Sequence, residues 1–258
     1  MRILLTGYKG FIGSNLYRAF PSNYEIVGYD WKEDLPEVSN FDWVIHLGAI
    51  SSTTETNVEK IMEQNYDFSV NLFEECVFAG VNMQYASSAS VYGLRTDFRE
   101  DAPVDPRTPY AWSKYLFERY VAKYKPKGVT VQGFRYFNVY GPGEEHKGSQ
   151  ASPFTKFEIQ KQKDGYITLF EQSDKYKRDF IHVNNVVDYH LRFLKIEESG
   201  VWNIGSGRTM SFRDVANLVG GVDGEKREIP IPNNIRPYYQ EYTCADMTKT
   251  RKTLVDNE

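Results

Sequence analysis

The glycine-rich stretch LLTGYKGFIGSN, at residues 4–15, constrains the fold of this chain more than any other feature. It joins the apolar run RILLT, typical of a buried strand, to FIGSNLYRAF, whose apolar residues have helical spacing. Gly7, Gly10 and Gly13 permit a tight turn and a close approach of backbone to a pyrophosphate, and a helix N-terminus stabilises that anion. The stretch therefore predicts the first turn of a dinucleotide-binding fold.

Strand-like and helix-like segments alternate through the first half of the chain. This alternation predicts an α/β fold, a Rossmann-type doubly wound parallel sheet. Only 11 residues separate Asp30 from Asp42, so one βα unit is expected to lack its helix. We expect further strands at 24–30, 42–49, 82–88 and 129–137, and helices at 57–80, ended by Gly80, and at 113–124.

The pattern becomes less regular after about residue 141, with more glycine, proline and polar residues. We expect residues 1–141 to form the dinucleotide-binding domain and residues 142–258 to form mainly a smaller, interleaved lobe that binds the substrate. The segment RDFIHVNNVVDYHLRFL, at 178–194, has the pattern of one more strand and helix. Residues 178–202 are therefore expected to return to the main sheet.

Composition excludes several classes of function. The net charge of −4 and the pI of about 5.7 argue against non-specific binding to nucleic acid or to anionic membranes. No apolar run approaches the roughly 18 residues of a membrane span. The N-terminus lacks the pattern of a signal peptide. The two cysteines and four histidines lack metal-ligand spacing, so we expect no metal and a cytoplasmic location.

A tyrosine and a lysine in TPYAWSKYLFERY are candidate catalytic residues. Tyr110 and Lys114 lie four residues apart, so they share one face of a helix. An ammonium group beside a phenol favours the phenolate, and we expect it to lower the pKa of Tyr110 so that the phenol can exchange a proton. The strand YASSASVYG ends in a serine cluster, from which Ser88 could bond a substrate hydroxyl; the alternative role of these serines is capping the strand exit.

Taken together, the TGxxGxxG loop, the serine strand end and Tyr-xxx-Lys resemble the extended short-chain dehydrogenase/reductases, the NAD-dependent epimerase/dehydratase family, which act on nucleotide sugars. Further stretches are similar to the ADP-heptose 6-epimerase group of that family, and the resemblance spans nearly the whole chain. The most specific block is FRYFNVYGPGEEHKGSQAS. These stretches are 46–55, 85–93, 134–152, 169–183 and 238–248.

The resemblance implies an epimerase that works by transient oxidation of its substrate with a tightly held nicotinamide cofactor. A carbon without an acidic proton can be inverted if hydride leaves, the carbonyl turns, and hydride returns to its other face. The turned carbonyl oxygen then needs a second proton donor. The resemblance implies Tyr110 and Lys147 as these two acid/bases; the alternative is that Lys147 is a surface lysine. A heptose substrate would imply supply of a lipopolysaccharide core sugar.

The resemblance also assigns the remaining site residues. Residues 46–52 would follow the cofactor, and Ser51 or Ser52 would lie near its ribose. The chain departs from the family after Asp30, where the usual adenine pocket is shortened, and we expect Asp34 and Leu35 of EDLP to contact the adenine in its place. Asn65 would lie near the same edge, or be a helix-surface amide. Residues expected to bind the substrate, a nucleotide-diphosphate sugar, are Ser88, Asn138, Ser149, Arg178 and Tyr239. Residues expected to bind the cofactor are Gly7, Gly10, Phe11, Ile12, Gly13, Asp30, Lys32, Leu47, Ala49, Tyr110 and Lys114.

Several alternatives stay open. Asp30 favours NAD, whereas Lys32 could pair with a 2′-phosphate and the resemblance favours NADP. A UDP-sugar 4-epimerase shares Ser88, Tyr110 and Lys114 but needs no HKGS lysine, whereas a 4,6-dehydratase needs acidic residues that SSASVYG lacks. A dinucleotide-binding sensor would need the glycine loop alone. The resemblance further implies a homo-oligomer formed through helices such as 57–80 and 108–125. The chain departs from the family in stopping soon after TKTRKTLVDNE, so we expect the family's usual final helix to be missing.

Overall fold

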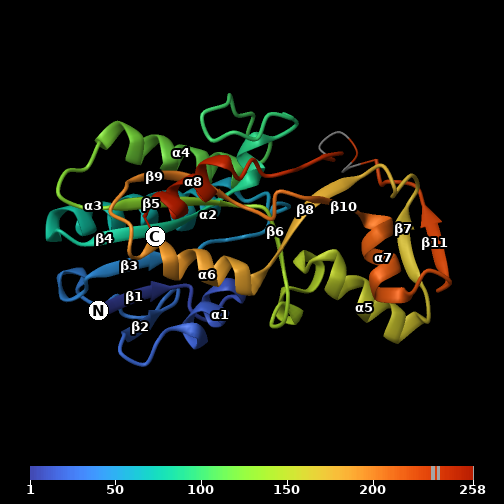
Figure 1. Ribbon diagram of the computed structural model, residues 1–258, viewed down its shortest axis with the longest axis horizontal. Coiled ribbons are helices and arrows are strands. Elements are labelled where there is room, and N and C mark those ends of the chain that lie inside the picture. The colour runs from blue at the N-terminus through green and yellow to red at the C-terminus, as the bar shows by residue number, and fades with distance from the viewer. Residues whose placement is uncertain (234–235, 237–238, 258) are drawn as a thin grey trace.

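The computed structural model describes residues 1–233, 236 and 239–257, and describes only the backbone of Ser149. Within these residues the chain builds a three-layer α/β part at one end and a smaller part at the other (Figure 1). The smaller part has its own strands and helices. The two parts meet at the carboxyl ends of the strands of the larger sheet.

A parallel sheet forms the centre of the larger part, as predicted. Each of its strands pairs in parallel with its neighbours, so their carboxyl ends lie at one edge. Both faces are covered by helices, which is why the strands read as near-continuous apolar runs. Its six strands among the described residues are, in spatial order, β2 (Glu25–Tyr29), β1 (Arg2–Thr6), β3 (Trp43–His46), β4 (Asn82–Ser88), β5 (Val131–Tyr136) and β9 (Gly200–Ile204).

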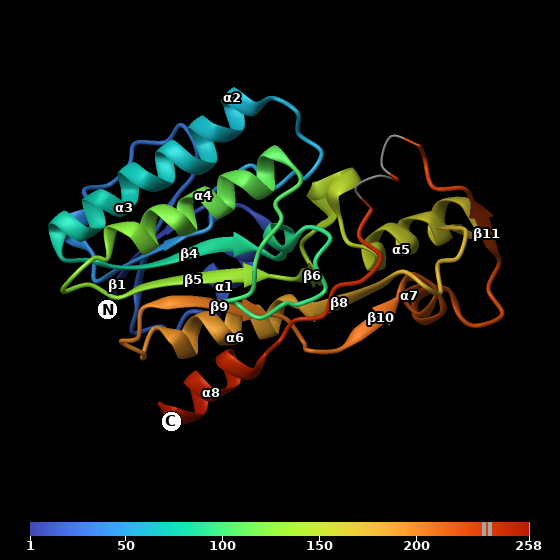
Figure 2. The same cartoon turned by 90° about the horizontal axis from the view of Figure 1, so that it is seen from above.

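Helices cover the two faces of this sheet, as Figure 2 shows. One face carries α1 (Phe11–Ala19) and α6 (Val183–Phe193), which pack on each other and bury Ile3 and Leu5. The other face buries Leu4. It carries α2 (Val58–Ile61), a π-helical segment at Met62–Asp67, α3 (Phe68–Ala79) and α4 (Pro109–Tyr124).

Among the described residues, the smaller part contains two short sheets and two helices that pack around Phe157, Leu169, Phe180 and Val215. The helices contact each other; one of them contacts one sheet and the other contacts both sheets. The first sheet has the order β10 (Thr209–Ser211), β8 (Lys177–His182), β6 (Asn138–Tyr140). The second pairs β11 (Lys226–Ile229) with β7 (Ile167–Phe170), and the helices are α5 (Pro153–Asp164) and α7 (Phe212–Gly220).

One expectation about the chain path is wrong, although α6 packs on the main sheet as expected. The strand at the start of 178–194 does not return to the main sheet: β8 pairs with β6 and β10, and the main sheet gains β9 instead. The lower polarity of GVWNI, which has Trp202 fully buried, explains why β9 is the strand that joins the core. Helix α8 (Thr248–Asp256) covers the edge at β9, and its Lys249 Nζ donates to Val201 O.

The shortened connection after β2 is confirmed, since only the 3₁₀ turn Val38–Asn40 lies between β2 and β3. The division into a cofactor domain and a substrate lobe remains a proposal about function. Among the described helices none is long and apolar enough to cross a membrane.

Candidate active site

A cavity of about 430 Å³ opens at the carboxyl edge of the central sheet, where α/β sheets commonly bind ligands. Side chains from both parts of the molecule line it. Most of the residues that the sequence singled out lie here. They are Gly7, Gly10, Phe11, Ile12, Gly13, Asp30, Leu47, Ala49, Ser88, Tyr110, Lys114, Asn138 and Lys147.

The glycine loop leaves bare backbone against this cavity. Gly7 has a φ of 70°, a conformation that favours glycine, and its N–H donates to Tyr29 O at 2.8 Å. A Cβ on Gly13 would lie 2.1 Å from Gly7 O, so no larger residue fits there. Gly10 stands in extended conformation at the start of α1. The cradle and the helix N-terminus behind it therefore suit the pyrophosphate of a nicotinamide dinucleotide.

Acidic groups surround the end of β2, where an adenosine ribose would lie. Asp30 lines the cavity, and its Oδ1 accepts from Trp31 N at 2.8 Å. Glu33 accepts from Asp30 N at 2.7 Å and from Lys9 Nζ at 2.5 Å. Lys32 has a φ of 74° and is not among the described residues that line the cavity. Asp34 and Leu35 are likewise absent from the described lining.

Helix α4 presents Tyr110 and Lys114 to the cavity. It begins at Pro109 after Thr108, whose side chain accepts from Ala111 N, so the pair sits in the first turns of a well-capped helix. Tyr110 is 9% exposed and Lys114 is 5% exposed, and Lys114 Nζ lies 5.9 Å from the centre of the Tyr110 ring. The expected shared face is confirmed.

The electrostatics of this pair differ from the expectation. Burial lowers the pKa of Lys114 to about 8. Burial also raises the pKa of Tyr110, and hydrogen bonding with Ser88 opposes this rise. The pKa of Tyr110 is therefore raised and not lowered as expected, because desolvation of the phenol is the largest effect on it.

Ser88 ends β4 and lines the cavity, and it also has the alternative role that the sequence left open. Its Oγ accepts from Ser90 N at 3.2 Å and so caps the 3₁₀ turn Ala89–Tyr92. The hydroxyl also bonds Tyr110, and its oxygen retains a second lone pair for a ligand. Capping and substrate contact are therefore compatible.

Asn65 is buried rather than a surface amide. It belongs to the π-helical segment, and its side chain bonds both Ile50 N and Ile50 O, at 2.8 and 3.0 Å. It also donates to Ser113 Oγ on α4 at 3.2 Å. Asn65 thus ties the loop after β3, which lines the cavity through Leu47, Ala49 and Ser51, to the helix that carries Tyr110.

Lys147 enters the cavity from a 3₁₀ turn at Glu145–Gln150. Its Nζ lies 5.2 Å from the centre of the Phe11 ring. Desolvation lowers the pKa of Lys147, Glu144 raises it, and Lys156 lowers it further. Lys147 is therefore a partly buried amine and not a solvated surface charge.

The residue that holds this turn, Glu144, was not among the predicted site residues. Glu144 is fully buried, and its carboxylate accepts from Ser152 N at 2.6 Å, Ser152 Oγ at 2.5 Å, Thr155 Oγ1 at 2.9 Å and Gly141 N at 3.3 Å. Its carbonyl oxygen accepts from Lys147 N at 3.0 Å. The doublet Glu144-Glu145 gives no local signal of which carboxylate is buried. A possible signal was Ser152-Pro153, a helix start that attracts an acidic group.

The remaining substrate candidates lie farther into the smaller part. Asn138 lines the main cavity, and its Nδ2 donates to Asp179 O at 3.0 Å. Tyr239 lines a second cavity of about 230 Å³, together with Phe212 and Tyr176. Arg178 lies over the Tyr239 ring at 5.3 Å and over the Phe212 ring at 5.4 Å. The side chain of Ser149 lies outside the described residues.

The chain was compared with known proteins. The model of the "NAD dependent epimerase/dehydratase family" matches residues 3–205. Among solved structures, the ADP-L-glycero-D-manno-heptose-6-epimerase of Helicobacter pylori is 27% identical, with a TM-score of 0.86 over 99% of this chain and 90% of that chain.

Two further solved structures are similar. An NAD-dependent NDP-hexosamine 5,6-dehydratase of tunicamycin biosynthesis is 25% identical, with a TM-score of 0.83 over 98% of this chain and 90% of that chain. The UDP-N-acetylglucosamine 4-epimerase of Methanobrevibacter ruminantium is 23% identical, with a TM-score of 0.89 over 98% and 91%, which shows the shared fold. The matched model covers most of the chain, including the glycine loop, Ser88, Tyr110 and Lys147, and the chain therefore belongs to the NAD-dependent epimerase/dehydratase family.

Proposed function

We propose that this protein is a nucleotide-sugar epimerase that inverts one carbon by transient oxidation, with an ADP-D-glycero-D-manno-heptose as the preferred substrate. The observation that carries this proposal is that two partly or fully buried proton-transfer groups, Tyr110 and Lys147, line one cavity from different segments of the chain. A one-base dehydrogenase or a sensor does not need the second group.

The chain's own residues divide the proton transfers. From one epimer, one of the pair removes the hydroxyl proton as the carbon is oxidised to a carbonyl. After the carbonyl turns, the other member returns a proton to the oxygen on the opposite side. Lys114 and Ser88 would donate hydrogen bonds close to this substrate oxygen and so orient it. A nicotinamide held by the glycine loop would accept the hydride and then return it.

The second cavity is the proposed place for the nucleotide. Aromatic rings of Tyr239, Phe212 and Tyr176 can stack on a base. Arg178 offers a planar guanidinium for a diphosphate, although it donates to Lys177 O and Gln240 O in this structure. Pro153 lines both cavities, so one ligand can span them.

For the cofactor, the acidic surroundings of β2 favour NAD over the NADP that the resemblance favours. A 2′-phosphate would approach Asp30 and Glu33, while Lys9 is already paired with Glu33. We expect NAD to bind at least about 10-fold more tightly than NADP. Titration calorimetry with both cofactors checks this, and a Glu33→Gln variant should narrow the difference.

The reaction is tested by a proton NMR time course with ADP-D-glycero-β-D-manno-heptose and no added nucleotide. Appearance of the 6″-epimer supports the substrate and shows that cofactor is retained and recycled. If nothing changes even with added NAD or NADP, the heptose assignment is wrong. UDP- and GDP-sugars would then be assayed in the same way. Epimerisation of one of them would support the proposed reaction with a different sugar nucleotide as the substrate.

A further inference from the structure

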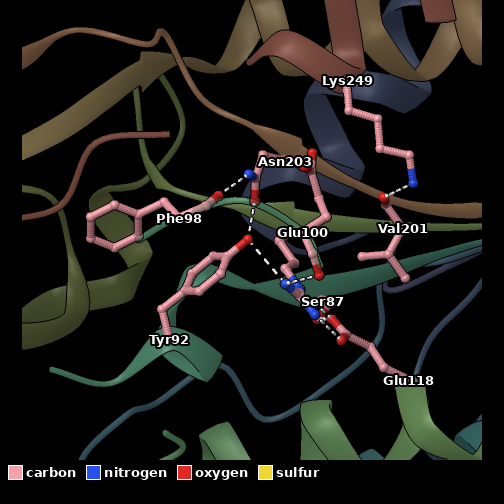
Figure 3. A network of polar contacts seen from close by, with 9 residues as sticks. Ser87, Tyr92, Phe98, Glu100, Glu118, Val201, Asn203 and Lys249 are labelled. Atoms are coloured by element: carbon pink, nitrogen blue, oxygen red, sulfur yellow. Dashed lines mark hydrogen bonds and ion pairs between the residues drawn. The ribbon is translucent and has the colours of Figure 1, made fainter. Parts of the chain in front are cut away.

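A buried polar network lies beneath the candidate active site, against the carboxyl ends of three neighbouring strands. Strand pairing sets Ser87 of β4 beside Arg135 of β5, and Arg135 beside Asn203 of β9. Glu118 reaches this row from helix α4. Figure 3 shows the row and the groups that close it.

Glu118 and Arg135 form a two-pronged ion pair at its centre. Arg135 Nη2 donates to Glu118 Oε2 at 2.6 Å and Arg135 Nε donates to Glu118 Oε1 at 3.0 Å. Ser87 Oγ donates to Glu118 Oε1 at 2.5 Å. Both charged side chains are only 5% exposed.

The remaining guanidinium nitrogen of Arg135, Nη1, is also hydrogen-bonded. Its Nη1 donates to Tyr92 OH at 3.0 Å and to Glu100 O at 3.2 Å. Tyr92 OH in turn donates to Asn203 Oδ1 at 2.8 Å, and Asn203 N donates to Glu100 Oε1 at 2.9 Å. The ion pair therefore joins α4, three strands and the loop after β4 in one satisfied network.

Stability alone does not explain such a pair. An apolar pair of similar volume in a buried position is often as stable as, or more stable than, an ion pair. What an apolar pair lacks is direction: a bidentate carboxylate–guanidinium contact fixes both the distance and the rotation of the elements that carry it. We therefore looked for the function of the ion pair in the active-site residues that these elements carry.

Each member of the pair adjoins the active site. Tyr110, Lys114 and Glu118 follow one another at four-residue steps along α4, about 6 Å per step, so they share one stripe of the helix. On the strands, Ser87 precedes Ser88 and Arg135 precedes Tyr136, and both of these following residues line the main cavity.

We propose that Glu118, held by Arg135 and Ser87, is a positioning residue that fixes the rotation of helix α4 against β4 and β5 and so sets Tyr110 and Lys114 relative to Ser88. This inference rests on the proposed roles of Tyr110 and Lys114. It adds three residues, on three elements, that act on the proton transfer through the positions of Tyr110 and Lys114.

The test replaces the pair without leaving a lone buried charge. In the cofactor-bound protein, Glu118→Leu combined with Arg135→Met should fold but lower kcat roughly 100-fold, the scale of a 1 Å misplacement, with little change in KM. Ser87→Ala removes only the strand's bond to Glu118 and should lower kcat less. Leu72→Ala, on the buried face of α3, is the matched control, because it destabilises the fold and should leave kcat unchanged.

A second readout does not depend on the substrate. Ultraviolet titration of the cofactor-bound protein, compared with the same variant carrying Tyr110→Phe, isolates the phenol of Tyr110. We expect its midpoint to shift in the double variant and in Ser87→Ala but not in Leu72→Ala. Wild-type kcat and an unshifted midpoint in the folded double variant or in Ser87→Ala would overturn the proposal. Absence of turnover in the wild type with every sugar would instead refute the proposed function and leave the titration to decide this inference.

Discussion

The cavity has two walls that are built by different means. Tyr110 and Lys114 stand on a regular helix of 16 residues that lies against the central sheet. Lys147 stands on a short 3₁₀ turn, interrupted at Gly148 with φ 52° and ψ −119°, and held from below by the carboxylate of Glu144. One wall is placed by secondary structure and the other by a single side chain.

This difference shows what fixes the position of each of the two proposed proton-transfer groups. On α4 the helical repeat fixes the spacing, and the buried network at Glu118 fixes the rotation. On the turn there is no repeating backbone bond pattern to rely on, so four hydrogen bonds to one buried carboxylate replace it. We expect the two walls to respond differently to substitution.

The largest expected effect comes from removing either proton-transfer group. Tyr110→Phe and Lys147→Met should each lower kcat about 10³-fold, the usual scale of acid–base catalysis. The two variants should lose the oxidation of opposite epimers. Each variant should still oxidise one of the two epimers, because the remaining group serves as its base.

Single-turnover absorbance of the reduced nicotinamide, measured with each epimer in turn, checks this. Retention of NAD binding serves as the control for folding. If the two variants oxidise the same epimer, the groups do not act on opposite sides, and the comparison between the walls fails.

A second effect concerns stability. The pKa of Lys114 is about 8 when folded and 10.5 in its ordinary state, so burial of its charge costs free energy below about pH 8, and this cost disappears as the pH rises towards about 10.5. Lys114→Met should therefore raise the free energy of unfolding of the cofactor-free protein by about 3 kcal/mol at neutral pH.

Urea unfolding at about pH 7 and about pH 10 measures this gain, which should shrink at the higher pH. Lys147→Met should give a smaller gain, because Lys147 is less buried. Lys123→Met, at an exposed position of the same helix, is the matched control and should change little. An equal gain in all three variants would show that methionine, and not the lost charge, stabilises the protein.

The smallest of the three effects isolates the turn. Glu144→Gln places an amide N–H₂ among groups that already donate, so at least one of its four bonds is lost, at a cost of about 2 kcal/mol. Glu145→Gln, one residue later and exposed, is the control and should stay within about 0.5 kcal/mol. Urea unfolding gives both values.

Turnover by the same two variants sharpens the comparison. Glu144→Gln should lower kcat through Lys147 and leave the ultraviolet titration of Tyr110 unchanged. A shifted Tyr110 titration would mean that the two walls are coupled.

The parts of the site that a regular repeat encodes could be predicted from the sequence. The glycine loop between strand and helix placed the cofactor cradle, and the spacing of four residues placed Tyr110 and Lys114 together, because both depend on neighbours in the chain. The fate of segment 178–182 could not be predicted in this way. Strand periodicity shows that a strand forms there but does not show which sheet it joins.

Contacts between segments that are distant in the sequence could not be predicted either. Ser87 and Glu118 are separated by 31 residues, and Glu118 and Arg135 by 17, so their meeting depends on the order of the strands. The pKa of Tyr110 was expected to fall because a lysine was near, but its rise depends on how much water the fold removes. Burial of Glu144 rather than Glu145 depends on the path of a turn.

The return of the chain at α8 has a mechanical consequence. The backbone passes between the two parts after β5, after β8, after β9 and again before α8, whose Thr250 and Thr253 bond Asn203 O and Trp202 Nε1 at the sheet's edge. A part joined to the rest of the molecule by a single crossing of the chain could rotate widely about that connection. A part attached by four crossings can rotate only through small angles, so the width of the cavity between Tyr110 and Lys147 should stay nearly constant during the proposed reaction.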